Sequence, residues 1–158
     1  MQHQTALLIG RFQPFHYGHL YLLKKTLSVT DRIIIGIGSA NVTDGNNPYS
    51  FVLRQKMINT VIKQEGFTKA VIQIVGLDDF PDDQQWLQQL LKNVKSFDVV
   101  VGNNEWTNSI LAGAGYPIMR IGYYQRYRYE GVKIRRLMQE GKNWQDRIPA
   151  YLIPLLVN

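Results

Sequence analysis

The sequence contains no cysteine, so disulfide bonds and thiolate metal sites are both excluded. It also has no hydrophobic run close to the ~20 residues that a membrane-spanning helix needs. The first residues, MQHQTALLIGRFQ, lack the basic segment of a signal peptide and contain only a short apolar run. We therefore expect a cytoplasmic protein that has no membrane partner.

Acidic residues are in the minority. Lys and Arg number 18 against 12 Asp and Glu, which gives a net charge of +6. This balance indicates an anionic partner, either nucleic acid, a membrane surface or a phosphorylated small molecule, unless the basic residues only form a solvated surface. Internal repeats and biased segments are also missing. With 158 residues, of which 45% are hydrophobic, the chain is expected to form one domain over residues 1–158.

Short apolar runs alternate with segments of helical periodicity. The runs predict strands at 6–10, 32–38, 71–75, 98–101 and 117–121. Helices are predicted from Gly18 onward, over 51–64, 82–93 and 105–112, and in a C-terminal segment of about 131–157 packed on the same domain. The order predicts an α/β fold, a doubly wound, Rossmann-like parallel sheet with helices on both faces. The functional site is then expected at the carboxyl ends of the strands.

The stretch GRFQPFHYGH, residues 10–19, places His16 and His19 where the first strand meets the first helix. A helix N-terminus attracts anions, Gly18 allows a ligand to approach the backbone, and Arg11 is able to grip phosphate. We expect a phosphate site in which the imidazoles donate hydrogen bonds. The alternatives are a nucleophilic histidine or a histidine acid–base pair, two structural histidines, or a zinc site completed by His3 near a frayed terminus.

This stretch resembles the HxGH motif of the nucleotidyltransferase superfamily. Over its full length it is similar to the archaeal-type nicotinamide mononucleotide (NMN) adenylyltransferases, which also form the N-terminal half of some bacterial bifunctional proteins. The likeness covers nearly the whole chain, and the chain is expected to lack the hydrolase module of the bifunctional proteins. Further matching features follow in order: IGSA at 37–40, Asn47-Pro48, Arg54, Trp86, Gly102-Asn103, Arg128-Tyr129, 131–136 and the closing QEGKNWQDRIPAYL.

The resemblance implies that the protein joins ATP and NMN into NAD and pyrophosphate, by in-line attack of the NMN phosphate on the ATP α-phosphorus. It implies catalytic roles for Arg11, His16, His19 and Arg135, with His19 holding the α-phosphate. Mg²⁺ would be held by the ATP phosphates and water, with no ligand from protein side chains. The implied ATP-binding residues are Gly10, Arg11, Phe12, Gln13, His16, Gly18, His19, Gly102, Asn103, Arg128, Gly131, Val132 and Arg135.

For the NMN side, the resemblance implies binding by Ser39, Arg54, Asp79 and Trp86. Trp86 would stack on the cationic nicotinamide ring, with simple core packing as the alternative. Arg54 falls on the inward face of its helix, where a charge is rarely left unpaired. It would line the phosphate cleft or else reach back to solvent. Asp82 is expected to cap the helix that carries Trp86.

One segment departs from the family. Members carry Ser and Thr in a segment like S-G-T-x-[IV]-R, whereas residues 130–135 here read EGVKIR. Both hydroxyls are missing, and Glu130 adds a negative charge that Lys133 is placed to offset. A weakly active or inactive nucleotide sensor therefore stays open as an alternative, as does an adenylyltransferase with nicotinate mononucleotide as acceptor.

The loop 123–129 interleaves arginines with tyrosines, which is also typical of single-stranded RNA binding. No recognised RNA-binding motif accompanies it. Our prediction is an ATP:NMN adenylyltransferase that forms a homo-oligomer, has ATP, NMN and NAD as ligands, and has no nucleic-acid partner.

Overall fold

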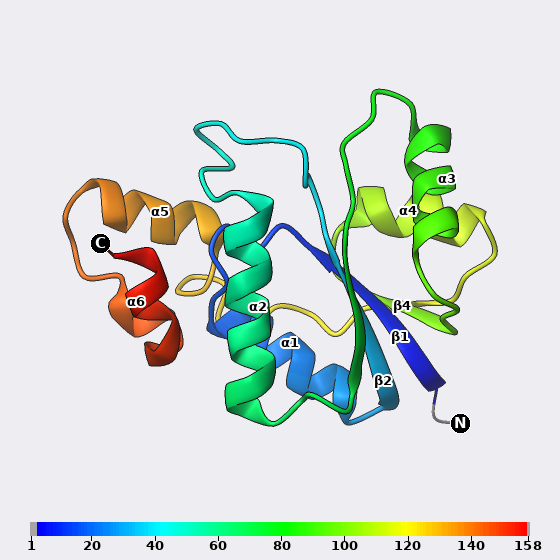
Figure 1. Cartoon of the computed structure of the whole chain (residues 1–158), viewed down its shortest axis with the longest axis horizontal. Helices are drawn as coiled ribbons and strands as arrows, with labels where there is room; N and C mark the ends of the chain where they lie inside the picture. Colours follow the sequence, from blue (N-terminus) through cyan, green and yellow to red (C-terminus); the bar gives the residue numbers. More distant parts are fainter. Residues whose placement is uncertain (1–2, 158) are drawn as a thin grey trace.

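The computed structural model describes residues 3–157 and shows a five-stranded parallel sheet between two layers of helices (Figure 1). The strand order is β3-β2-β1-β4-β5. The strands are β1 (His3–Gly10), β2 (Thr30–Ile37), β3 (Val71–Gly76), β4 (Val99–Val101) and β5 (Ile118–Met119). The helices are α1 (Tyr17–Leu27), α2 (Phe51–Glu65), α3 (Asp83–Asn93), α4 (Glu105–Gly113), α5 (Gly131–Gln139) and α6 (Ile153–Leu156), with 3₁₀ turns η1 (Gln145–Arg147) and η2 (Ala150–Leu152).

The predicted α/β doubly wound fold is confirmed, and the main differences lie at the two ends of the chain. β1 begins at His3, whose backbone pairs with Thr30, so the expectation of a frayed terminus at His3 is wrong for the backbone. The expected helix over about 131–157 is broken into four short pieces. α5 stops before Gly141, which adopts a left-handed φ of 66°. Pro149 then separates η1 from η2, because the residue before it, Ile148, is extended.

The sheet is covered on both faces, which explains its continuous apolar strands. Ile33 and Ile35 of β2 face a large core that includes residues of α1, α2, α5 and the C-terminal turns. Their neighbour Ile34 faces the opposite way, into a core with Leu7 and residues of α3 and α4. In Figure 1, α1, α2, α5 and α6 accordingly lie on one side of the sheet, and α3 and α4 on the other.

Side-chain caps fix where the helices begin. The Ser50 hydroxyl accepts a hydrogen bond from Leu53 N at 3.2 Å at the start of α2. Asp82 accepts one from Gln84 N at 3.0 Å, which confirms its predicted capping role at α3. Asn104 caps α4 in the same way, because its Oδ1 accepts from Thr107 N at 3.1 Å. These bonds satisfy amides that have no partner within the helix.

The order of the strands determines where a ligand is expected. β1 is central, with β2 on one side and β4 on the other. The chain runs outward from β1 to β3 and then returns to β4, so the order reverses beside β1. In open parallel sheets, a crevice forms outside the carboxyl ends of the strands at such a reversal. Within residues 3–157, the structure has no helix long and apolar enough to cross a membrane.

Candidate functional site: two pockets at the carboxyl end of β1

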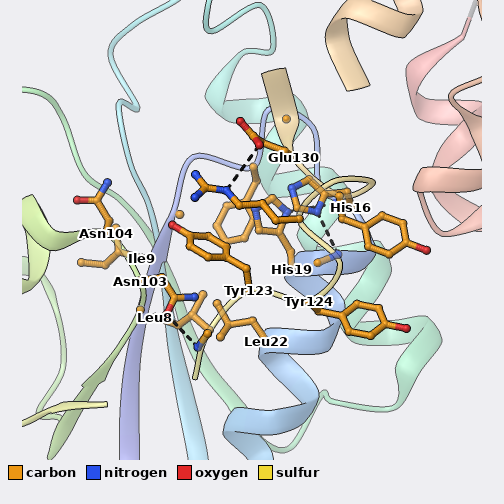
Figure 2. Close-up of a pocket in the computed structure, with 18 residues that line it drawn as sticks. Leu8, Ile9, His16, His19, Leu22, Asn103, Asn104, Tyr123, Tyr124 and Glu130 are labelled. Carbon is orange, nitrogen blue, oxygen red and sulfur yellow. Dashed lines mark hydrogen bonds and ion pairs between the residues drawn. The ribbon is translucent and has the colours of Figure 1, made fainter. Parts of the chain in front are cut away.

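Two adjoining pockets open at this reversal, and both are lined by Ile9, Gly10 and Asn104. The first, of about 200 Å³, contains His16 and His19 and is called the histidine pocket here (Figure 2). The second, of about 260 Å³, is called the tryptophan pocket and contains the indoles of two tryptophans, Trp86 and Trp106. The shared edge formed by Gly10 means that ligands in the two pockets would lie next to each other.

His16 and His19 cap the start of α1 together. His16 Nδ1 accepts a hydrogen bond from Gly18 N at 3.1 Å, and His19 Nδ1 accepts one from His16 N at 3.1 Å. The two rings stack with their centroids 3.7 Å apart. Because each Nδ1 is an acceptor, the proton of each neutral ring must be on Nε2.

Burial keeps both rings neutral. It lowers the pKa of His16 from the ordinary 6.5 to about 3. The pKa of His19 is also well below its ordinary value, first because of burial and second because of the neighbouring His16. Desolvation penalises the charged imidazolium relative to the neutral ring. Near neutral pH the pocket therefore contains two uncharged imidazoles, each with one N–H donor.

Gly18 is required by the close packing of this cap. A Cβ atom at this position would lie 2.8 Å from His16 Cε1 and 3.2 Å from Tyr129 Cβ. Gly131 at the start of α5 is similarly confined, since a Cβ there would lie 3.2 Å from Gln13 O. Both glycines line the histidine pocket, so the N-termini of α1 and α5 converge on it. Helix N-termini carry partial positive charge, and α5, which has no side-chain cap, also offers free amides; both features suit a polyphosphate.

Arg135 and Gln13 support the wall of the site without lining either pocket. Arg135 is 9% exposed and its Nη1 donates to Gln13 O at 2.7 Å. Burial and the nearby Arg11 lower the pKa of Arg135. The Gln13 side chain is held by Tyr49, to whose carbonyl it donates at 3.1 Å and from whose amide it accepts at 2.9 Å. Arg135 thus ties α5 to the loop that follows β1.

Three other residues expected to contact ATP do not line the histidine pocket. Arg11 is exposed and lines the tryptophan pocket, where its Nη1 donates to Asn47 Oδ1 at 3.3 Å. Arg128 pairs with Asp146 at 3.1 Å and, like the 46% exposed Val132, lines neither pocket. The remaining expected residues, Gly10, Phe12, Gly102 and Asn103, do line the histidine pocket.

The loop between β5 and α5 also lines the histidine pocket. Glu130, whose negative charge was expected near the phosphates, is joined there by Tyr123 and Arg126, which sequence analysis did not assign to the site. Arg126 lies over the ring of Tyr123, with its Cζ 3.9 Å from the centroid. Glu130 makes no side-chain cap bond to α5, and its Oε2 is 3.6 Å from both Arg126 Nε and Lys133 Nζ. The expected pairing of Glu130 with Lys133 is confirmed, and Arg126 is a second, unexpected partner.

Tyrosines anchor this loop on α1. Tyr124 stacks on Tyr21 with centroids 4.5 Å apart, and Tyr129 meets Tyr17 at 5.8 Å. Tyr127, by contrast, is 71% exposed. The alternating pattern that also suggested RNA binding thus includes tyrosines that pack against a helix.

The tryptophan pocket brings together Ser39, Asp79 and Trp86, as predicted. Ser39 Oγ donates to Asp79 Oδ1 at 3.0 Å. Asn41 holds the backbone of Asp79 from both sides, because its Oδ1 accepts from Asp79 N at 2.8 Å and its Nδ2 donates to Asp79 O at 3.3 Å.

Trp106 was not predicted, although it lines the same pocket. It is 48% exposed, whereas Trp86 is 2% exposed and belongs to the core under α3 and α4. The two rings meet at 5.3 Å with an interplanar angle of 58°. Trp86 therefore packs in the core as well as lining the pocket, and Trp106 has the more accessible indole face.

Arg54 is fully buried and lines neither pocket. The alternative in which its side chain reaches solvent is therefore wrong. Its guanidinium hydrogen-bonds to main-chain carbonyls of the loops after β1 and β2.

The residues present suit a divalent cation that arrives bound to phosphate. Within residues 3–157 there is no group of three or more His, Asp or Glu side chains placed to hold a metal ion. Glu130 is the one carboxylate among the described residues that line the histidine pocket, and cations already surround it. Mg²⁺ commonly keeps its waters and binds through substrate phosphates, which this donor set allows.

A parallel sheet with paired neutral imidazoles at a helix N-terminus, beside a second aromatic pocket, defines an α/β nucleotide-binding protein built for phosphate chemistry. A family model described as cytidylyltransferase-like matches residues 7–137. The chain belongs to this family and, within it, to the nucleotidyltransferases named nicotinamide-nucleotide adenylyltransferase.

Relatives and solved structures agree with this assignment. The nicotinamide-nucleotide adenylyltransferase of Archaeoglobus fulgidus is 36% identical over 96% of this chain and 89% of its own. That of Thermoplasma volcanium is 33% identical over 96% and 84%.

Among solved structures, a bifunctional NMN adenylyltransferase/ADP-ribose pyrophosphatase from Francisella tularensis, complexed with AMP and a manganese ion, superimposes with a TM-score of 0.80 at 26% identity. The match covers 93% of this chain but only 44% of the bifunctional protein.

Proposed function

We propose that this protein transfers the adenylyl group of ATP to NMN, forming NAD and pyrophosphate within one domain spanning residues 1–158. The observation that carries the proposal is the pair of neutral imidazoles in a pocket that shares the edge at Gly10 with a second, aromatic pocket. The reaction needs two phosphorylated substrates side by side. The names of the relatives support the choice of ATP and NMN.

ATP binds in the histidine pocket in this proposal. Its triphosphate meets the partial positive charge at the N-termini of α1 and α5, beside Gly18 and Gly131, and the amides of α5 that no side chain caps. His16 and His19 direct their Nε2–H groups at the phosphates, with His19 at the α-phosphate. Gly10, Phe12, Gly102 and Asn103 complete the pocket around the nucleotide.

NMN binds in the tryptophan pocket. Its phosphate lies toward Arg11 and the shared edge, and its cationic ring lies toward Trp86 and Trp106. An oxygen of the NMN phosphate attacks the α-phosphorus in line. The new O–P bond forms as the bond from the α-phosphorus to the bridging oxygen of pyrophosphate breaks, so no protein atom is covalently modified.

The protein's contribution is then orientation and charge stabilisation. The two neutral N–H donors are fixed in place before the reaction. Their hydrogen bonds become stronger as charge grows on the equatorial oxygens of the α-phosphate, and the donors do not need to reorganise. The pocket leaves a divalent cation to the triphosphate itself, where such an ion would neutralise negative charge on the leaving pyrophosphate. We propose Mg²⁺ for this role. The manganese ion reported with the bifunctional Francisella protein supports a divalent cation.

Asp79 favours NMN over nicotinate mononucleotide as the acceptor. Its carboxylate lines the tryptophan pocket, where Arg11 is the one basic side chain among the described lining residues. In this arrangement Arg11 is occupied by the acceptor phosphate. The ring carboxylate of nicotinate mononucleotide would then face the carboxylate of Asp79 without a cation to pair with.

The experiment is to incubate the protein with Mg²⁺, ATP and either NMN or nicotinate mononucleotide, and to measure dinucleotide and pyrophosphate. NAD and pyrophosphate in equal amounts, with at least a ~10-fold preference for NMN, is the expected result. Tight nucleotide binding without any product would instead favour the sensor, which the lost hydroxyls at 130 and 132 keep as the second candidate. We also propose a homo-oligomer, as the family resemblance suggests, and light scattering on the purified protein tests it.

A further inference from the structure

Arg54 contacts main-chain carbonyls from two separate loops. Its Nη1 donates to Arg11 O at 3.0 Å and to Gly38 O at 2.7 Å, and its Nη2 donates to Ser39 O at 3.0 Å. Its Nε donates to Ser50 O at 3.3 Å, one turn earlier at the start of α2. The residue has 0% exposure, so this charge is neutralised by carbonyl dipoles and not by water.

The two loops both line the tryptophan pocket, beside the edge that it shares with the histidine pocket. Arg11 follows β1, beside Gly10 at the edge shared by both pockets, and Ser39 follows β2 in the tryptophan pocket. Gly38 N also donates to Gly10 O at 2.8 Å. Arg54 thus bonds to the loops of both strands without lining either pocket.

Both loops contain a residue in a conformation that needs such support. Ser39 has a φ of 50° and Phe12 a φ of 54°, in the left-handed region that side chains disfavour. Strained backbone of this kind persists only where the surroundings hold it in place. Three of the four carbonyls that Arg54 binds belong to Ser39 itself, to the residue before it, and to the residue before Phe12.

We propose that Arg54 is a positioning residue that fixes the loop after β1 relative to the loop after β2, and thereby aligns the attacking NMN phosphate with the ATP α-phosphorus. The alignment part of this proposal rests on the proposed function. Arg54 acts through the carbonyls and does not touch substrate, which differs from the direct NMN contact expected from the sequence.

The geometry also explains why arginine is needed. A planar guanidinium presents five N–H donors in a fixed fork, and here four hydrogen bonds reach carbonyls in three segments. A lysine at the same position keeps the positive charge but presents a single nitrogen, which is unable to bridge both loops and Ser50. Charge and bridging are therefore separable by substitution.

The test compares Arg54→Lys and Arg54→Met with Lys56→Met, a control that removes an exposed cation from the same helix. Calorimetry measures the Kd of a non-hydrolysable ATP analogue and of NMN, and steady-state kinetics measure kcat. We expect each Kd to change by less than ~3-fold in Arg54→Lys while kcat falls ~10- to 100-fold, because misplacement by about 1 Å is enough to lose in-line geometry. Lys56→Met should match the wild type.

Two kinetic results would overturn the proposal. A large rise in the Kd of NMN with kcat unchanged would make Arg54 a direct substrate ligand. Wild-type kcat and Kd in Arg54→Lys, even with a lowered melting temperature, would leave it a stabilising residue only.

Amide hydrogen exchange without substrates gives an answer that does not depend on the reaction. Exchange should accelerate in Arg54→Lys at both 10–13 and 38–40 and stay unchanged in Lys56→Met. Unchanged exchange in either segment contradicts the link between the loops. If the wild-type protein formed no NAD, the proposed function would fail, while the exchange result would still decide whether Arg54 joins the loops.

Discussion

His19 Nδ1 accepts a hydrogen bond from the backbone amide of His16, and the two imidazoles stack at 3.7 Å. His16 Nδ1 in turn accepts a hydrogen bond from Gly18 N, so each ring is bound to the backbone through its own Nδ1. The HxGH spacing therefore builds a helix cap whose two remaining ring N–H groups are fixed as donors.

The first prediction concerns stability against pH. The pKa of His16 is about 3 in the folded protein and ordinarily 6.5, so the unfolded chain takes up a proton first as the pH falls. The contribution of His16 to the free energy of unfolding is therefore fully present above pH 6.5. It falls by ~1.4 kcal/mol per pH unit as the pH is lowered from 6.5 toward 3. Urea unfolding between pH 7 and 4 measures the slope. His16→Asn retains a capping oxygen without the titration and should give a shallower slope, whereas equal slopes would contradict the buried neutral ring.

The second prediction concerns His19. His19→Ala should lower kcat ~10²-fold or more, since it removes a fixed donor to the transition state. It also deletes one cap bond worth ~1 kcal/mol, so the protein should still fold. Steady-state kinetics with a circular-dichroism melt check both statements. Lys25→Ala, an exposed change on the same helix, is the control. Near-normal turnover of His19→Ala would remove this residue from the mechanism.

The third prediction concerns Glu130, whose carboxylate lines the histidine pocket and pairs with Arg126 and Lys133 at 3.6 Å. Glu130→Gln should lower the KM for ATP ~5-fold, because it removes a repulsion of ~1 kcal/mol and frees two cations for the triphosphate. Glu130→Ser should do the same and also raise stability by ~1 kcal/mol, since serine caps α5. A raised KM in both variants would show that the carboxylate assists binding.

The fourth prediction separates the two tryptophans. Trp106→Ala should raise the KM for NMN ~5- to 30-fold through the loss of ring stacking worth ~1–2 kcal/mol, with the KM for ATP unchanged. Trp86→Ala should lower the free energy of unfolding by ~3–5 kcal/mol, because Trp86 is 2% exposed in the core. Quenching of tryptophan fluorescence by NMN should be strongly reduced in Trp106→Phe. An unchanged KM for NMN in Trp106→Ala would exclude the stacking role.

The sequence was sufficient to predict most of the fold. Strands that are buried on both faces appear in the sequence as continuous apolar runs, and the predicted cap at Asp82 marks a helix start through a local hydrogen bond. The C-terminal segment was predicted less well, because 3₁₀ turns of three residues are too short for a periodic pattern. β5 was predicted over five residues and spans only Ile118–Met119.

The site was predictable where it is local in sequence. His16, Gly18 and His19 lie within one turn of helix, so their spacing alone carries the geometry. Trp106 and Arg126 reach the pockets only through the packing of their elements, and no spacing in the sequence relates them to the histidines. The inward position of Arg54 was predicted from its helix, but its hydrogen-bond partners in the two loops were not. These loop carbonyls lie 15 to 43 residues away along the chain.

The most direct test is nitrogen-15 NMR of the histidine rings at pH 7, without and with a non-hydrolysable ATP analogue and Mg²⁺. We predict that His16 and His19 are both neutral, with the proton on Nε2, and that both Nε2 resonances shift when the analogue binds. A charged imidazolium, a proton on Nδ1, or rings that do not respond to the nucleotide would contradict the account.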